Sequence, residues 1–378
     1  MRVRFVIIVL LAVCFTSFSQ DESAGSNKSQ PYFQMQYHVG SFWSRTETLQ
    51  EQFDAGYWGL EARLGFQTTG RKMWQQECRY PKYGLGIYFA DLVMNREDTI
   101  VGNPFALFAF YNATIFSVNR FTFGTDMSVG LSYTPLISDP VTNPQNDVLA
   151  SHWNLFFGFK LNMDVELTHR LGMNLGYGLT HHSNGRVHVP QKGVNTWGWS
   201  MGMKYLLVEP VGIIQNEAPE FLSHSEVQFM GAIGTVEQIA IPNVYPDRYF
   251  NTSVAVDYAY KFNPRMALTL GLNWFYDGST AIAIGNLPPE EVSTYQKMYL
   301  GTHLGYQLNV SRITFMFNMG TYFMKHTADR GIWFARGGGR IRLIDNLYFH
   351  LAVKTKAGVR SDWIEWGLAY HLKVKTYE

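Results

Sequence analysis

The stretch LGMNLGYGLTHHSNGRVHVPQKGVNTWGWSMGMKY, residues 171–205, decides the fold class. Apolar residues alternate with small or polar ones from Leu171 to Leu179, and the same alternation returns from Asn195 to Tyr205. A period of two residues is typical of a β-strand with one apolar and one polar face. The stretch therefore predicts a hairpin of two long strands joined by a loop at 184–194.

Polar residues interrupt the apolar face of this hairpin beside its loop. Continuing the count puts His181 and Ser183 on the apolar side of the first strand and His182 on the other side. Asn195 opens the apolar side of the second strand. Burying polar groups without partners is costly, so we expect these side chains to bond to one another. His-x-Ser is the pairing of a base with a nucleophile, and the alternative is a cluster that only tethers the loop.

The same alternation recurs along the whole chain, separated by short turns such as those around Asn119, His169, Asn263, Ser311 and Asn346. Longer polar loops alternate with these turns, which is typical of an outer-membrane barrel with its short turns in the periplasm. The His181 end of the hairpin is then expected on the extracellular side. The predicted strands are 33–44, 56–67, 82–92, 104–116, 120–132, 153–166, 171–183, 195–206, 225–236, 249–261, 265–276, 297–308, 312–323, 332–343, 346–356 and 362–374.

Composition supports the same class. Hydrophobic residues make up 46% of the chain and aromatic residues 16%, while charged residues are only 16% and the mean hydropathy is -0.12. Soluble domains carry roughly a quarter charged residues, and a net charge of +1 does not favour nucleic-acid binding. We therefore predict an all-β, transmembrane, antiparallel outer-membrane β-barrel. A large soluble β-sandwich or β-barrel is the alternative.

The chain divides into five predicted segments. Residues 1–20 read as a secretory signal peptide, because Arg2 and Arg4 precede an apolar run that is too short to span a membrane. Its removal takes away Cys14 and leaves Cys78 alone, which excludes an internal disulfide and a cysteine metal cluster. The other segments are a disordered N-terminal segment at 21–32, a first barrel half at 33–206, a periplasmic connection at 207–224 and a second half at 225–378.

A weak internal repeat relates the two halves. The sequence RFTF at 120–123 opens a strand of the first half, and RITF at 312–315 opens one of the second. The hairpin at 171–205 has a counterpart at 347–372 that lacks the His-x-Ser set. One barrel of about sixteen strands and two eight-stranded barrels in tandem both fit this pattern. We prefer the single barrel, because one closure removes every strand edge.

Charged and aromatic side chains on these strands have expected places. Asp164 and Glu166 neighbour each other on a polar face, and we expect them to line the lumen with lysine and arginine partners instead of acting as paired catalytic carboxylates. Tryptophans near strand ends are expected in the aromatic girdles at the membrane interfaces: Trp197, Trp199, Trp363 and Trp366.

The sequence HHSNGRVHVPQKGVN at 181–195 resembles the signature of the lipid A 3-O-deacylase family, the acyloxyacyl hydrolases of outer membranes. The shared pattern is His-x-Ser-Asn, a loop with a Pro-x-x-Gly step, and a polar residue that opens the last strand. The segments GNPFALFAFYNATIF at 102–116 and SHWNLFFGFKL at 151–161 are also similar to that family. The resemblance covers about 80–206 and leaves 225–374 outside the compact family domain.

The resemblance implies a barrel that removes the ester-linked acyl chain at the 3-position of lipid A. It implies Ser183 as the nucleophile and His181 as the general base. The third residue of the catalytic set is a glutamate in the best-known relatives of that family, and this chain has Asn195 in its place. An asparagine orients the base but supplies no charge. Oxyanion donors are expected from Asn184, the backbone N–H of Gly185, or Gln191.

The expected partners are lipopolysaccharide in the outer leaflet, through its lipid A, and the outer-membrane lipids, without nucleic acid; a homodimer stays open. Neither a cofactor nor a metal is expected, since no carboxylate completes a ligand set around the histidines. An apolar seat for the acyl chain is expected from Met201, Met203, Leu175 and Leu179, and phosphate contacts from Arg186 and Lys192.

Two other functions stay open on the sequence alone. About sixteen strands is the size of a porin, and in a transport barrel the lumen residues Lys204, Asp164 and Glu166 would matter more than His181. A catalytically inactive barrel that only binds lipopolysaccharide is the other. Mass spectrometry of lipid A from cells with and without the protein distinguishes an enzyme from both.

Overall fold

The computed structural model describes residues 29–43, 56–92, 100–190, 192–217, 220–238, 247–285, 287, 291–357 and 360–377. The predicted signal peptide at 1–20 lies outside these residues. So do residues 21–28 of the segment predicted to be disordered, whereas Gln30–Tyr32 of that segment already belong to the first strand.

The described residues form sixteen antiparallel strands, which confirms the predicted fold class. Each strand lies within a few residues of its predicted place, because the period of two reports directly on an extended backbone with unlike faces. The first eight are β1 (Gln30–Phe42), β2 (Tyr57–Gln67), β3 (Lys82–Asp91), β4 (Phe105–Val118), β5 (Phe121–Tyr133), β6 (Trp153–Glu166), β7 (Leu171–Ser183) and β8 (Val194–Leu206). The others are β9 (His224–Gln238), β10 (Asp247–Lys261), β11 (Met266–Asp277), β12 (Met298–Val310), β13 (Ile313–Met324), β14 (Trp333–Ile344), β15 (Leu347–Lys356) and β16 (Arg360–Thr376).

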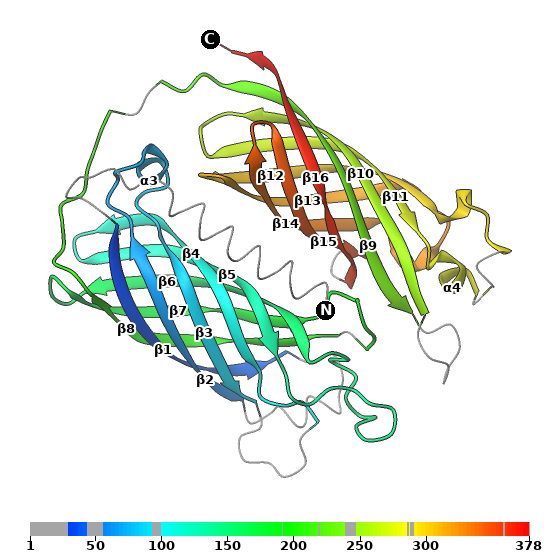
Figure 1. Ribbon diagram of the computed structural model, residues 1–378, viewed down its shortest axis with the longest axis horizontal. Helices are drawn as coiled ribbons and strands as arrows, with labels where there is room; N and C mark the ends of the chain where they lie inside the picture. Colours follow the sequence, from blue (N-terminus) through cyan, green and yellow to red (C-terminus); the bar gives the residue numbers. More distant parts are fainter. Residues whose placement is uncertain are drawn as a thin grey trace. The chain divides into compact units, whose positions relative to one another are not determined.

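The strands close into two separate barrels of eight, β1–β8 and β9–β16 (Figure 1). Strand β1 pairs with β8 along Tyr32–Phe42, and β16 pairs with β9. The tandem arrangement is therefore the correct one, and the preferred single barrel of sixteen strands is wrong. Closing twice removes the strand edges as completely as closing once, so edge protection does not distinguish the two arrangements.

The first barrel carries apolar side chains outside and polar ones inside. Its interior holds a buried network in which the Arg63 guanidinium donates to Asp126 and to Glu61, with the Lys160 ammonium 3.4 Å from Glu61. Asp164 is paired with Lys82, as expected of a lumen residue, whereas Glu166 is exposed at the strand end. Outward apolar side chains include Met35, Leu64, Ile87, Leu161 and Met201.

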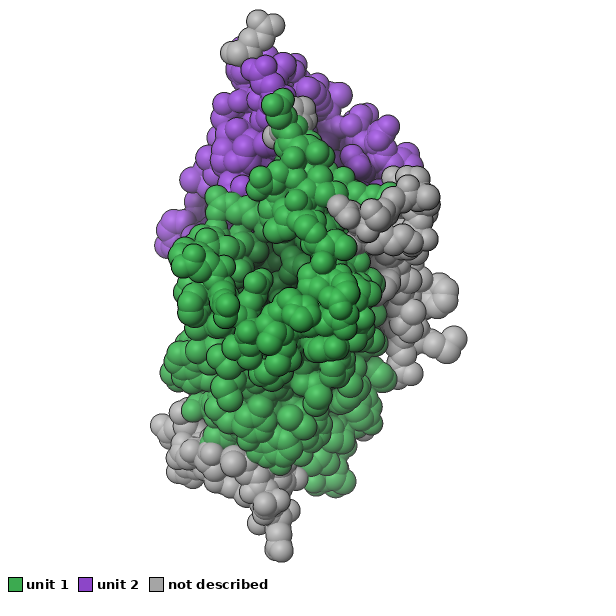
Figure 2. Space-filling view, turned by 90° about the vertical axis from the view of Figure 1, so that its left-hand side faces the viewer, with its two compact units in different colours: residues 1–184, 190–218 green, residues 185–189, 219–378 purple. Residues whose placement is uncertain are grey.

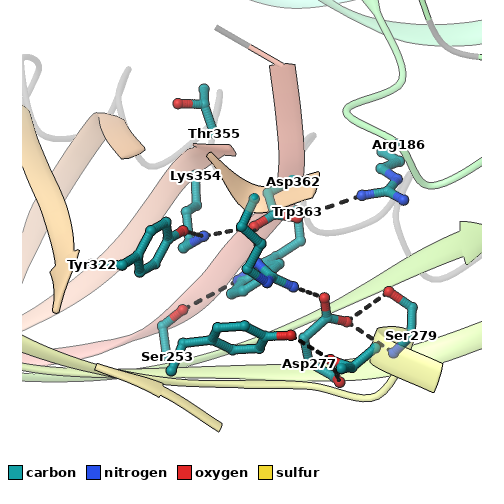
Figure 3. A network of polar contacts seen from close by, with 12 residues as sticks. Arg186, Ser253, Asp277, Ser279, Tyr322, Lys354, Thr355, Asp362 and Trp363 are labelled. Atoms are coloured by element: carbon teal, nitrogen blue, oxygen red, sulfur yellow. Dashed lines mark hydrogen bonds and ion pairs between the residues drawn. The ribbon is translucent and has the colours of Figure 1, made fainter. Parts of the chain in front are cut away.

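The second barrel also has an interior filled with paired charges (Figure 3). The Lys354 ammonium donates to the Tyr322 hydroxyl at 2.7 Å and to the Asp362 carboxylate at 2.6 Å. Trp363, expected in an interfacial girdle, is instead completely buried, and its ring lies 4.2 Å from the Lys354 ammonium. The expectation fails because Trp363 is in the inward phase of β16, which it shares with the buried residues Glu365 and Ala369.

Helices are a minor part of the fold. Among the described residues they are the short α3 (Met73–Glu77) and α4 (Thr280–Gly285), with two brief 3-10 turns, and none is long and apolar enough to cross a membrane. The backbone N–H groups of Ile214 and Asn216, in the connection after β8, donate to Thr69 and to the Gln76 side chain near α3.

The chain separates into two compact units, shown in different colours in Figure 2. The first comprises residues 1–184 and 190–218, and the second comprises 185–189 and 219–378. Each unit contains one of the two barrels.

Candidate functional site

The β7–β8 hairpin brings His181 and Asn195 directly opposite each other, as register partners in the two strands. Their side chains meet with 2.6 Å between Nδ1 of His181 and Oδ1 of Asn195. Because an amide oxygen only accepts hydrogen bonds, Nδ1 carries the proton and donates it. The lone pair of the neutral imidazole is then on Nε2, which is the atom that a general base needs.

Ser183 is the last residue of β7 and shares the face of His181, two residues away. Gly193, just before β8, lies against both residues, with a positive φ of 73°. A Cβ added to Gly193 would lie 2.8 Å from Cε1 of His181 and 3.2 Å from Cβ of Ser183. A glycine is therefore required here both for its backbone conformation and for the space, and this close approach keeps the histidine and the serine side by side.

His181 and Asn195 lie half-buried on the outward wall of the first barrel, and Ser183 continues their face but is buried beside Gly193. Tyr177 and Leu179, on the same face of β7, are 36% and 43% exposed. The side chains on the opposite face are buried, and among them the Thr180 and Thr196 hydroxyls lie 2.5 Å apart, directly beneath the His181–Asn195 pair. A polar cross-strand pair thus interrupts an otherwise apolar outer surface.

His182 points the other way, as the alternation predicts. It is buried in the barrel interior, where its ring stacks on Tyr88 with 6.2 Å between centroids and tilts against Phe156 at 5.1 Å. The two neighbouring histidines therefore lie in different surroundings, and of the two only His181 has its register partner in Asn195.

The structure places the remaining predicted site residues in different surroundings. Asn184 and Gly185 follow β7 directly and are buried, with Gly185 in the left-handed region at a φ of 63°. Gln191 lies outside the described residues. The two expected phosphate ligands already have carboxylate partners: Arg186 lies 3.4 Å from Asp362 within the second compact unit (Figure 3), and Lys192 pairs with Asp147.

Sequence reasoning missed the loop that supports this site. The sequence predicts only a long polar loop at 133–152, most of which lies between β5 and β6. In the structure the Val148 carbonyl accepts a hydrogen bond from the Gly193 N–H at 3.0 Å, and Val148 and Leu149 are buried in the same apolar cluster as Val194. The apolar pair inside a polar loop was the available signal for a buried anchor.

Comparisons with known proteins agree with this picture. The family model described as lipid A 3-O-deacylase (PagL) matches residues 31–204, and the model described as the acyloxyacyl hydrolase C-terminal domain matches residues 225–374. No curated protein sequence matches the chain.

Among solved structures, Neisserial surface protein A is similar at 11% identity and a TM-score of 0.32, with 47% of this chain and 97% of that chain covered. Pseudomonas aeruginosa OccK8 is similar at 12% identity and a TM-score of 0.26, with 93% of this chain and 100% of that chain covered.

Proposed function

Because this chain belongs to the lipid A 3-O-deacylase family, we propose that it is an outer-membrane esterase that removes an ester-linked acyl chain from lipid A. In this proposal Ser183 is the nucleophile, His181 the general base and Asn195 the residue that orients the base. The observation that carries it is the 2.6 Å contact between His181 Nδ1 and Asn195 Oδ1 on the outward wall, beside Ser183.

The first chemical step is acylation of Ser183. Its Oγ attacks the ester carbonyl carbon while Nε2 of His181 accepts the hydroxyl proton, which forms a tetrahedral intermediate with a negative oxygen. Asn184 and the backbone N–H of Gly185, next in the chain, are the proposed oxyanion donors. The bond from carbon to the sugar oxygen then breaks, and His181 returns its proton to that oxygen.

The second step releases the acyl chain as a fatty acid. A water molecule attacks the acyl-Ser183 carbonyl, and Nε2 of His181 takes the water proton and then gives it to the departing Ser183 oxygen. Asn195 keeps Nε2 directed at the reaction through its bond to Nδ1. Its amide dipole stabilises the imidazolium less than a carboxylate would, so the set is a weaker form of the common triad.

The outward position suits the substrate. Lipid A carries its acyl chains in the outer leaflet, so an enzyme that cuts them benefits from reactive groups on the lipid-facing wall. Leu179, Met201 and Met203 are exposed on that wall, with Leu179 two residues from His181 and the methionines six and eight residues along β8 from Asn195. Flexible methionines adapt to a chain of variable conformation, and these residues form the proposed acyl seat.

The barrel size weighs against transport. An eight-stranded barrel has an interior that side chains fill, whereas a water-filled channel needs about sixteen strands. Of the lumen residues that a porin would use, Asp164 is buried and bound to Lys82, and Lys204 is half-buried. The porin function thus loses the wide lumen on which it depended.

The test uses the purified full-length protein and lipid A in mixed micelles. Mass spectrometry should show the loss of one acyl chain and the appearance of the matching free fatty acid. Ser183→Ala should bind lipid A but release no fatty acid. Release that continues with Ser183→Ala would remove this mechanism, and a wild-type protein that binds lipid A without cutting it would be the inactive binding barrel.

A further inference from the structure

The loop 134–152 between β5 and β6 contacts three consecutive residues, 192–194, where the chain enters β8. Asp147 pairs with Lys192, the Val148 carbonyl accepts the Gly193 N–H at 3.0 Å, and Leu149 lies in the apolar cluster with Val194. Three contacts in a row make this segment a continuation of the wall behind the site. Val148 and Leu149 are called the support segment below.

Several contacts hold the support segment in place: the Leu149 carbonyl accepts a hydrogen bond from the Ser138 N–H at 2.7 Å, and the buried Asn146 side chain binds two of its backbone N–H groups. The Asn146 side chain has no exposed surface, and its amide nitrogen donates to the Ile100 carbonyl at 3.0 Å. Its amide oxygen accepts from the N–H groups of Val148 at 3.1 Å and Leu149 at 3.3 Å. Buried amides stay where their hydrogen bonds are made, since breaking them leaves unpaired polar groups. Asn146 therefore fixes the support segment to residue 100.

The support segment in turn fixes the distance between β8 and the reactive pair. The Val148 carbonyl holds the Gly193 N–H, and Gly193 lies directly against Cε1 of His181 and Cβ of Ser183. We propose that Asn146 is a positioning residue for the Ser183–His181 pair, acting through Val148 and Gly193. This inference rests on the esterase function proposed above.

Positioning matters here because the acylation step needs two side chains from one strand to stay aligned. A displacement of about 1 Å in a reacting group can lower a rate by about a hundredfold. Asn146 touches neither Ser183 nor His181 in any contact described above, so its effect on the rate must pass through the backbone. The effect of an Asn146 substitution must also be larger on the rate of the bond-making step than on the affinity for the substrate.

Two variants and one control separate the parts of this arrangement. Asn146→Ala removes all three hydrogen bonds. Asn146→Asp keeps an oxygen for the N–H groups of Val148 and Leu149 but has no N–H for the Ile100 carbonyl. Asp147→Asn is the control, because it changes only a partly exposed ion pair at the same contact, and such pairs contribute little.

The measurement is the reaction of the full-length protein with a fluorophosphonate probe. In this reaction the Ser183 Oγ–phosphorus bond forms, fluoride leaves with the bonding electrons, and His181 takes the hydroxyl proton. A loss of positioning lowers the labelling rate constant of every molecule, whereas partial unfolding lowers the final extent of labelling. Asn146→Ala should reduce the rate constant about 10–100-fold with full final labelling. The kcat on lipid A should fall alongside it, with KM nearly unchanged.

The variants should rank in a fixed order. Asn146→Asp should fall between Asn146→Ala and wild type, and Asp147→Asn should stay within about twofold of wild type. A wild-type rate constant in Asn146→Ala would overturn the positioning role, and so would a reduced extent with an unchanged rate constant. Failure of the esterase function is visible separately, as a wild-type protein that the probe does not label or a Ser183→Ala variant that it labels equally; either result withdraws both proposals.

Discussion

The last hairpins of the two barrels have the same framework and different chemistry. In the first barrel Leu179 faces Trp197, and two residues further on His181 faces Asn195. In the second barrel Leu351 faces Trp366, and two residues further on Val353 faces Ile364. A polar cross-strand pair in the first barrel is thus matched by an apolar pair in the second.

The interiors differ in the opposite sense. The inward residue beside the polar pair of the first barrel is His182, which packs among aromatic rings. The matching inward residue of the second barrel is Lys354, which donates to Asp362 at 2.6 Å and to Tyr322 at 2.7 Å. Polar groups lie on the outer wall at this level in one barrel and inside in the other. We infer that the second barrel keeps the fold without the reactive outer set.

The substitution with the largest expected effect is Ser183→Ala. Loss of the nucleophile should reduce fatty-acid release from lipid A by about 10⁴-fold or more, because no other group replaces the attacking oxygen. The matched change is Thr355→Ala, which removes the hydroxyl two residues after Val353 in the second barrel. It should leave the rate within about twofold of wild type, because the Thr355 hydroxyl bonds to the Ala335 backbone in the second barrel and has no part in the proposed reaction. Equal losses in both variants would contradict a functional difference between the barrels.

His181→Ala should have nearly the same effect as Ser183→Ala. The double variant should be no slower than either single one, since residues that act as one unit have non-additive effects. The measurement is kcat on lipid A, with heat-dependent gel mobility confirming that the barrel is folded.

Two controls sharpen this prediction. Val353→Ala changes the residue of the second barrel that matches His181, and it should not change the rate. His182→Ala should reduce the rate much less than His181→Ala does, because His182 faces the interior. A multiplicative loss in the Ser183→Ala and His181→Ala double variant would show that the two residues act separately.

Asp362→Ala tests the interior of the second barrel. It removes the carboxylate from Lys354 and Arg330, which are both buried and bonded to it at 2.6 and 2.7 Å. Removal of one partner from a buried ion pair costs about 3–5 kcal/mol of unfolding free energy. Urea unfolding from lipid vesicles, followed by tryptophan fluorescence, measures the loss. The double variant with Lys354→Met should recover part of it, and an unchanged unfolding midpoint for Asp362→Ala would contradict this account.

The strands were predictable from the sequence, but their closure was not. Alternation with short turns specifies each strand and its neighbour, and these signals are identical for one barrel of sixteen strands and two of eight. Closure depends on which distant strands pair, such as β1 with β8, and strand pairing between distant segments leaves no periodic signal in either strand. The connection after β8 was the available clue, because it lacks the alternation found on both sides of it.

The outward histidine, serine and asparagine were predictable for a similar reason. They follow the count of two along β7 and β8, and the cross-strand register then joins His181 to Asn195. Asn146 could not be found this way, because it lies in an irregular loop whose hydrogen bonds reach residue 100. Trp363 was misplaced because its nearness to a strand end was weighed in place of the count of two, which puts it on the inward face with Glu365 and Ala369.

The smallest expected effect concerns Asn195, where the first barrel supplies an amide in place of a charge. Asn195→Ala should lower kcat by about tenfold, because the base loses its orienting bond while the nucleophile and the oxyanion donors stay in place. Its folded fraction should stay near that of wild type. The counterpart of Asn195 in the second barrel is Ile364, which faces Val353, so the fold does not need a polar residue at this position.

Asn195→Asp and Asn195→Glu should raise kcat, whereas Asn195→Ala should lower it. Asp places a carboxylate oxygen where Oδ1 now lies 2.6 Å from His181 Nδ1, with no change in side-chain length. Glu provides the residue of the best-known relatives at the cost of one more methylene. A negative charge here stabilises the imidazolium that forms as Ser183 attacks, and preorganised groups of this kind can contribute about 3–4 kcal/mol. Part of that amount should raise kcat about tenfold, more in whichever variant fits the space beside Gly193. Equal rates for wild type, Asn195→Ala, Asn195→Asp and Asn195→Glu would show that position 195 has no part in the reaction, and the two hairpins would then differ only in His181 and Ser183.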